Sequence, residues 1–214
     1  MIIDFTAYTS SERYHLMTQT LIPRPIAWAL TASDLSGDKI LNLAPFSYFT
    51  AVSSEPALMM ISVGKKPSGE NKDTLSNVLE NKKIVIHIAS SAQAALVTQT
   101  AATLELGESE ISMIRSQGTG KELSTADFDG FDLPRLADCD IAYACELFEV
   151  KHIENASQVL IFVEIKQVYI NADSTSRDDK QRLKIHADKI APLARLGANE
   201  YTGITSPFTV QRPK

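Results

Sequence analysis

One short segment combines the residue types that a flat polar ligand needs where it approaches a backbone. Residues 42–47 read Asn-Leu-Ala-Pro-Phe-Ser and lie between two apolar runs. Alanine allows close approach to an aromatic plane, proline removes one amide donor, and neighbouring amides can pair with the oxygens and nitrogens of a heterocycle. A β-bulge or barrel corner without a ligand would have a similar composition, so the segment alone leaves both interpretations open.

Three further segments could bind an anion. Residues 31–33 (Thr-Ala-Ser) end an apolar run, where hydroxyls and backbone amides can meet a phosphate. Residues 72–74 (Lys-Asp-Thr) begin a predicted helix, which Asp73 or Thr74 is expected to cap while Lys72 supplies a positive charge. Arg195 could bind a phosphate through two hydrogen bonds. The alternatives are a strand-ending turn, a capped surface helix with a solvated lysine, and a structural ion pair.

The elements that position these segments are mainly strands. Apolar, β-branched runs predict strands over residues 24–32, 56–63, 83–89, 140–150 and 158–170. Helices are predicted over residues 74–81, 92–104 and 109–115, whereas residues 118–133 and 171–188 are polar and are predicted to be loops. Short turns between successive strands favour an antiparallel sheet, so we expect a mainly β protein, a closed or nearly closed barrel with peripheral helices.

The bulk composition is that of a globular protein, and we expect one domain over residues 1–214. Of the 214 residues 44% are hydrophobic and 22% charged. The net charge of -5 argues against a broad nucleic-acid surface but leaves room for a small anionic ligand. No leader peptide and no apolar run of membrane-spanning length are evident, so a cytoplasmic location and no membrane partner are expected. The cysteines, Cys139 and Cys145, are expected to be reduced and partly buried rather than disulfide-bonded.

Several common catalytic and cofactor motifs are missing. Gly118-Thr119-Gly120 begins like a dinucleotide fingerprint, but Leu123 replaces its last glycine, and no phosphate-binding loop or serine elbow is present. The histidines have no metal-ligand spacing, so no metal site is expected. A nicotinamide dinucleotide would therefore have to bind without a Rossmann unit.

The order of these segments is more specific than any one of them. The run Pro-Arg-Pro-Ile-Ala, then Thr-x-Ser, Asn-Leu-Ala-Pro-Phe-Ser, Glu-Pro and Lys-Asp-Thr closely resembles the flavin reductase-like family of FMN-binding split barrels, which includes flavoredoxin-type proteins. The C-terminal segment from Pro192 to Tyr201 and the Ala144-Cys145-Glu146 strand resemble it too, so the match covers roughly residues 15–203. Ala198 replaces the family's second glycine after Arg-Leu-Gly, which makes that backbone less permissive.

The resemblance implies an antiparallel six-stranded split barrel, a homodimer, and FMN bound at or near the dimer interface. By position, residues 31, 33, 72 and 74 would meet the phosphate, and residues 42, 44 and 47 the ribityl chain and the isoalloxazine edge. Ser62 on the adjacent strand and Arg195 are further candidates. The full set of expected cofactor-binding residues is Thr31, Ala32, Ser33, Asn42, Leu43, Ala44, Pro45, Phe46, Ser47, Ser62, Lys72, Asp73, Thr74 and Arg195.

The resemblance also implies a function. We expect an FMN-binding oxidoreductase, an NAD(P)H-dependent flavin reductase in which hydride passes from NADH or NADPH to flavin N5 and electrons pass on to flavin, oxygen, a redox protein or a monooxygenase. Backbone donors of residues 42–47 would stabilise the reduced flavin, and no single catalytic residue is identified. The alternatives are a flavoredoxin-like electron carrier without its own NAD(P)H site, a reductase that uses flavin as a diffusing substrate, and a non-enzymatic FMN-binding module.

Overall fold

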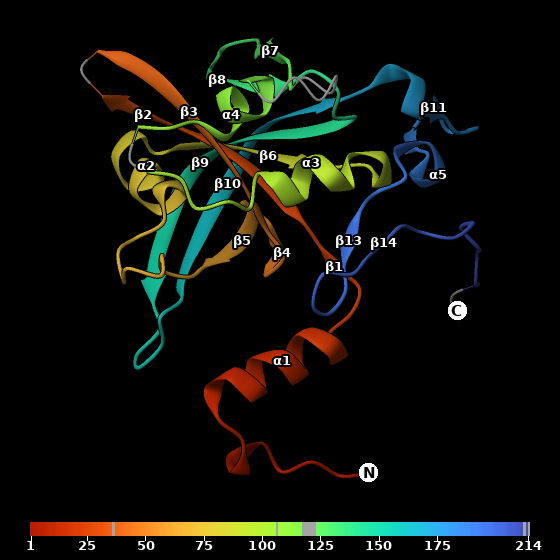
Figure 1. Cartoon of the computed structure of the whole chain (residues 1–214). Helices are drawn as coiled ribbons and strands as arrows, with labels where there is room; N and C mark the ends of the chain where they lie inside the picture. The colour runs from red at the N-terminus through yellow and green to blue at the C-terminus, as the bar shows by residue number, and fades with distance from the viewer. Residues whose placement is uncertain (36, 106, 117–122, 212, 214) are drawn as a thin grey trace.

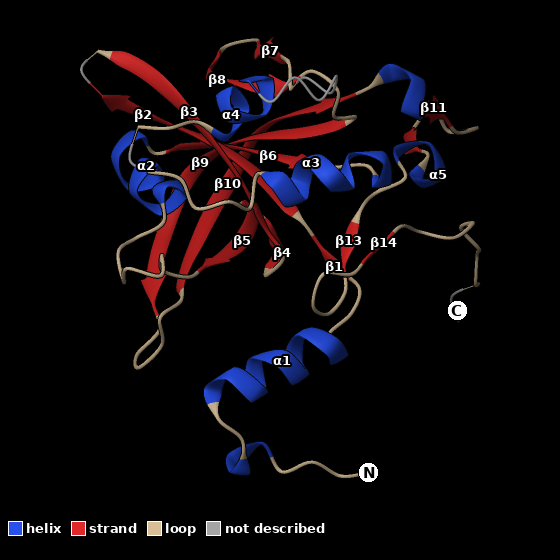
Figure 2. Ribbon diagram, viewed as in Figure 1, coloured by secondary structure: helices blue, strands red, loops and turns tan. Residues whose placement is uncertain are grey.

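A seven-stranded antiparallel sheet forms the body of the protein (Figures 1 and 2). The computed structural model describes residues 1–35, 37–105, 107–116, 123–211 and 213. In sheet order the strands are β3 (Asp38–Phe46), β2 (Ala27–Leu35), β6 (Lys83–Ile88), β9 (Ile141–His152), β10 (Val159–Ile170), β5 (Ala57–Val63) and β4 (Phe49–Ser54).

The two edge strands of this sheet, β3 and β4, are consecutive in the chain, so the sheet curls into a split barrel. Only Ser47 and Tyr48 separate them, and the Ser62 N–H donates a hydrogen bond of 2.8 Å to the Tyr48 carbonyl beside this corner. The expected fold class is confirmed. The sheet has seven strands rather than the expected six because the chain re-enters it as β4 immediately after the corner.

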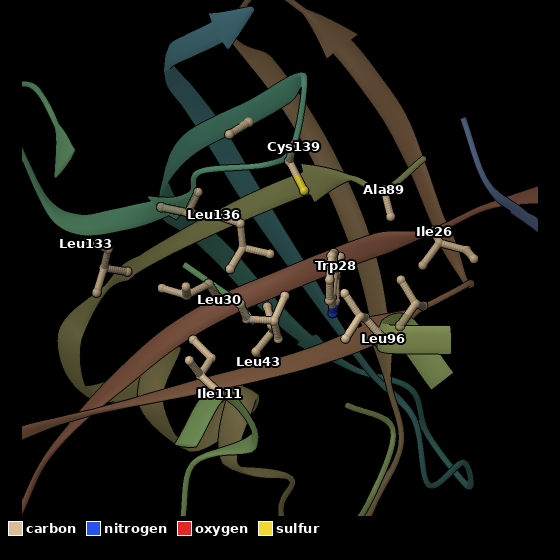
Figure 3. Close-up of a cluster of buried hydrophobic side chains, with 14 of the residues drawn as sticks. Ile26, Trp28, Leu30, Leu43, Ala89, Leu96, Ile111, Leu133, Leu136 and Cys139 are labelled. Atoms are coloured by element: carbon tan, nitrogen blue, oxygen red, sulfur yellow. The ribbon is translucent and has the colours of Figure 1, made fainter. Parts of the chain in front are cut away.

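Strand β2 is buried on both faces from Ala27 to Ala32, which explains why these residues are apolar apart from Thr31. Ala27 and Ala29 pack into the barrel interior with residues of β5, β6 and β10. Trp28 and Leu30, which point the other way, pack under a layer of helices and loops (Figure 3). The Trp28 indole N–H donates to the Thr100 hydroxyl at 2.8 Å, so its polar atom is satisfied.

Five α-helices of the described chain lie at the periphery: α1 (Ser10–Thr20), α2 (Asp73–Asn81), α3 (Ala94–Gln99), α4 (Glu110–Ser116) and α5 (Ala187–Ile190). Helix α1, which the sequence reading did not predict, begins with a capping box between Thr9 and Glu12 and projects away from the barrel (Figure 1). Helix α3 ends at Gln99, before the predicted residue 104. No helix in the described ranges is long and apolar enough to span a bilayer.

The predictions of loops over residues 118–133 and 171–188 were wrong for most of their described parts. A hairpin, β7 (Thr125–Phe128) and β8 (Phe131–Leu136), occupies the first segment because Phe128, Leu133 and Leu136 are buried in the cluster around Trp28. The second contains the short pair β11 (Thr175–Arg177) and β12 (Leu183–Ile185). The Gly118-Thr119-Gly120 motif lies outside the described residues.

A small second sheet completes the fold below the barrel. It joins β1 (Arg24–Pro25), β13 (Ala194–Arg195) and β14 (Tyr201–Thr202), with Arg24 opposite Arg195. The sheet brings the N-terminal and C-terminal parts of the resemblance together (Figure 1), and Arg24 on β1 donates a hydrogen bond to Ser47 at the corner between β3 and β4.

Candidate functional site

A buried hydrogen-bond network holds Asn42 in the barrel wall. Thr31, its register partner on β2, donates to the Asn42 Oδ1 at 3.3 Å, and Thr74 on α2 donates to the same oxygen at 3.1 Å. Thr31 in turn accepts a bond of 3.0 Å from the Asn77 side-chain amide. These contacts orient the amide oxygen of Asn42 toward α2 and leave its amide nitrogen to donate elsewhere.

The amide nitrogen of Asn42 donates to a carboxylate that the sequence reading missed. Glu110, the first residue of α4, is 3% exposed and accepts from Asn42 Nδ2 at 2.9 and 3.0 Å. It also accepts from the Leu43 backbone N–H at 2.9 Å. Burial raises the pKa of the Glu110 carboxyl, and the negative charge of Asp73 raises it further, while the amide donors act in the opposite direction.

The hydrogen bonds of this network determine which atoms of residues 42–47 remain free to contact a ligand. The Leu43 N–H is already bonded to Glu110, and Thr31 is fully buried. Thr31, Ala32, Ser33 and Leu43 line none of the cavities beside this segment. Their direct contact with a flavin therefore stays a prediction, and of the four only Thr31 has an observed side-chain contact with the segment, its hydrogen bond to Asn42.

Three cavities meet at Pro45, immediately after the network. The lysine cavity, of about 50 Å³, is lined by Lys66, Lys72, Thr74 and Glu110 together with Asn42 and Ala44. The arginine cavity, of about 250 Å³, is lined by Arg24, Arg195, Tyr14 and Tyr201 together with Ser47. The outer cavity, of about 270 Å³, is lined by Phe46, Ser47, Ser62 and Lys72. Pro45 lines all three, and the three cavities around it are together called the groove.

The lysine cavity contains the start of α2. Lys72 occupies the N-cap position and its side chain makes no capping hydrogen bond, so the expectation that Asp73 or Thr74 caps the helix was wrong. Asp73 instead pairs with Lys66 at 2.8 Å, and the Thr74 hydroxyl is directed to Asn42. The first-turn amides therefore lack a side-chain cap from the N-cap residue. The Lys72 ammonium lies 5.9 Å from the centre of the Phe46 ring.

The arginine cavity also borders Pro45. Arg24 is 9% exposed, and its guanidinium donates to the carbonyls of Thr18, Leu21 and Leu196 at 2.6, 3.0 and 2.8 Å. Its Nε donates to the Ser47 hydroxyl at 3.4 Å. Sequence reading missed Arg24 as a site residue because only the tertiary fold brings it to Ser47, 23 positions along the chain.

The structure thus brings most of the expected site residues to one groove. Those that line at least one of its cavities are Asn42, Ala44, Pro45, Phe46, Ser47, Ser62, Lys72, Asp73, Thr74 and Arg195. A larger cavity of about 690 Å³ lies between the start of β3 and α4, and its lining residues include none of those expected.

The two cysteines and His87 are buried and line none of the three cavities. Cys139 and Cys145 are both free and buried, and burial raises the pKa of each to about 12, which keeps the thiols protonated. His87 accepts from the Leu136 N–H at 2.9 Å through Nε2, so its Nδ1, 3.0 Å from the Trp28 carbonyl, carries the hydrogen. Within the described residues, no group of three or more potential ligands is placed to hold a metal.

Known proteins similar to this chain share its fold. The flavin reductase like domain model matches residues 18–190. The uncharacterized protein YwrF of Bacillus subtilis is 30% identical over 215 residues, which cover 96% of this chain and 95% of that protein. The nitrilotriacetate monooxygenase component B structure from Bacillus cereus superposes with a TM-score of 0.83 at 28% identity, covering 98% of each chain. The 2-nitrobenzoate 2-nitroreductase NbaA of Pseudomonas fluorescens gives 0.82 at 25% identity, covering 100% of this chain and 96% of that one.

Proposed function

Because this chain belongs to the flavin reductase-like family, we propose that it binds FMN in the groove around Pro45 and uses it as an oxidoreductase. The observation that carries the proposal is the meeting of three cavities at Pro45, with the uncapped start of α2 and the Lys72 ammonium at one end.

The donors of the lysine cavity support its assignment to the phosphate of FMN, although Asp73 and Glu110 are also in its lining. Helix N-terminal amides and an ammonium group are the donors that a phosphate prefers. Lys72 makes no salt bridge in the described part of the chain, whereas Lys66 is paired with Asp73. Lys72 and the first-turn amides of α2 would therefore hold the phosphate. Glu110, at the back of this cavity, would keep Asn42 and Leu43 in place.

The Ala44–Ser47 region fits the flat ring system. Alanine and proline present little bulk there, and both are half-buried at the surface of the groove. Ser47, which accepts from Arg24, would offer its hydroxyl to a ring edge beside a positive charge. When bound, FMN would supply the capacity to accept hydride at N5 from NADH or NADPH, and the protein would bind, orient and shield it.

The relatives support an electron-transfer role of this kind. One neighbour is a component of a monooxygenase and another is a nitroreductase, so a monooxygenase partner or an aromatic acceptor are both consistent with the family. A homodimer is proposed as the working form. Helix α1 and the following residues expose Tyr14 (60%), Met17 (38%), Leu21 (59%) and Ile22 (48%), an apolar set that a second copy could cover beside the groove.

The phosphate assignment is tested by Lys72→Ala. Removing a charge-assisted hydrogen bond costs roughly 1.5–3 kcal/mol, so we expect the FMN dissociation constant to rise about ten- to a hundredfold. The measurement is a fluorescence-quenching titration of flavin-free protein. Lys65→Ala is the matched control, because Lys65 is exposed and lines none of the three cavities. Equal affinities of the wild type and Lys72→Ala would remove Lys72 from the site.

A further inference from the structure

A buried carboxyl group without a counter-ion lies in the wall of the lysine cavity. Glu110 is 3% exposed, lines this cavity, and makes no salt bridge within the described ranges. Its hydrogen-bond donors, the Asn42 side-chain amide and the Leu43 N–H, are neutral. Burying a negative charge that no cation offsets is unfavourable, and burial accordingly raises the pKa of Glu110.

The other charged groups of the lysine cavity come from α2 and the loop before it. Lys66 and Asp73 pair at 2.8 Å, so their charges offset one another, whereas Lys72 makes no salt bridge in the described residues. Strand β3 and residues 100–103 contribute only uncharged side chains to the lining. An ionised Glu110 would therefore offset the charge of Lys72, and a protonated Glu110 would leave that charge free to attract an anion.

The hydrogen bonds of Glu110 allow it to hold a proton in place. Its Oε2 accepts from both the Leu43 N–H and Asn42 Nδ2, whereas its Oε1 accepts from Asn42 Nδ2 alone, at 2.9 Å. A proton on Oε1 therefore leaves both bonds to Oε2 intact. A protonated carboxyl group is also a hydrogen-bond donor, which an ionised one is not. Glu110 can thus change its charge without loss of the network around Asn42.

We propose that FMN binding is coupled to the uptake of one proton from solvent by Glu110, so that the phosphate binds beside a neutral carboxyl group. The inference rests on the proposed function, because it places the FMN phosphate in the lysine cavity. A phosphate and an ionised carboxylate in one cavity of about 50 Å³ repel each other strongly. Protonation of Glu110 removes this repulsion and makes flavin affinity dependent on pH.

The test compares the FMN affinity of the wild type and Glu110→Gln by fluorescence titration between about pH 5 and 8, where proteins are usually most stable. Glutamine is neutral at every pH and so imitates the protonated group. At an effective dielectric constant of about 20, a nearby negative charge weakens phosphate binding roughly ten- to a hundredfold. We therefore expect Glu110→Gln to bind FMN that much more tightly than the wild type at the upper end of the range, with a smaller difference at the lower end.

Two controls isolate Glu110 and the phosphate. Glu108→Gln makes the same substitution at an exposed position that lines none of the three cavities, and it should follow the wild type. Riboflavin lacks the phosphate, so its affinity should have the same pH dependence in all three proteins. Calorimetry of the wild type in buffers with different ionisation enthalpies counts the protons directly. At about pH 7, above the second pKa of a phosphate monoester, we expect proton uptake with FMN and none with riboflavin.

The outcomes separate this inference from the proposed function. A Glu110→Gln variant that binds FMN more weakly than the wild type across the range would show that Glu110 only supports the fold, and would overturn the inference. FMN binding with equal pH dependence in wild type and Glu110→Gln, or without proton uptake, would overturn it too and leave the proposed function standing. A wild type that binds no FMN would refute the proposed function and the inference with it. The proton count needs only the wild type, so it decides the matter even if Glu110→Gln does not fold.

Discussion

Replacing Glu110 by glutamine turns one of the two acceptor oxygens of a buried carboxylate into a hydrogen-bond donor. The Glu110 carboxylate accepts from Asn42 Nδ2 at 2.9 and 3.0 Å and from the Leu43 N–H at 2.9 Å. Glu110 Oε2 accepts from both donors, so a glutamine with its oxygen in that place keeps both bonds, while its amide nitrogen then faces Asn42 Nδ2 in place of an acceptor 2.9 Å away. The buried donor left without a partner is then the glutamine amide itself.

The expected cost follows from this geometry. An unsatisfied buried donor costs about 1–3 kcal/mol, so Glu110→Gln should reduce the free energy of unfolding by about that amount at pH 7. Glu110→Ala strands both donors and opens a cavity, for which we expect about 3–5 kcal/mol. Urea unfolding followed by circular dichroism measures both values. The charge-matched control is Glu154→Gln, at an exposed position that makes no salt bridge in the described residues.

The pH dependence gives a second test of the same residue. Because burial raises the pKa of Glu110 above its unfolded value of 4.5, the folded state holds the proton longer than the unfolded state. Its contribution to stability is fully present below pH 4.5 and is lost as the pH rises through the folded pKa. The difference in free energy of unfolding between wild type and Glu110→Gln should therefore grow as the pH is lowered toward 4.5. A Glu110→Gln variant as stable as the wild type would refute the account of this network, and a stability difference that grows as the pH rises would refute the raised pKa of Glu110.

Two further stability predictions follow from single residues. Burial lowers the pKa of His87 from 6.5 to about 4, so its contribution to stability is present above pH 6.5 and lost as the pH falls toward 4. At about 1.4 kcal/mol per pH unit, the free energy of unfolding of the wild type, measured with urea, should fall by roughly 3 kcal/mol more than that of His87→Gln across this range. Equal pH dependence of the two proteins would contradict this prediction. Ala198 adopts φ 47°, a left-handed conformation that costs a residue with a Cβ about 1 kcal/mol, so Ala198→Gly should raise the unfolding free energy by roughly 0.5–1 kcal/mol. A glycine variant with a lower melting temperature would show that this φ is not strained.

The strands with long β-branched runs could be predicted from the sequence, because a strand that is buried on both faces consists almost entirely of apolar residues. The runs around Ile84 and Ile161 are examples. Helix α1 was missed because only Thr18 of its residues is buried, so it has no apolar stripe to detect. The hairpin β7–β8 was missed because its polar residues mask the few side chains, such as Leu133, that pack on the core.

The residues that line the groove could be predicted from the sequence, but the residues that hold them in place could not. The Ala44–Ser47 region and Lys72 carry their chemistry in residue type, and the structure brings them to one groove. Glu110 is 68 positions from Asn42, and an acidic residue in a first helical turn is ordinary on surfaces, so nothing local marks it as buried. The cap at α2 was misjudged because Asp73 has a competing partner in Lys66, a tertiary contact.

The most direct test of the central claim is the absorbance spectrum of the purified protein with FMN, recorded after gel filtration and again after anaerobic addition of NADPH or NADH. We predict flavin bands that remain with the protein and bleach on addition of one nucleotide. Retained bands that neither nucleotide bleaches would contradict the NAD(P)H-dependent reaction and favour an electron carrier that needs a partner. A protein that retains no added FMN would contradict the assignment of the groove around Pro45 as a flavin site.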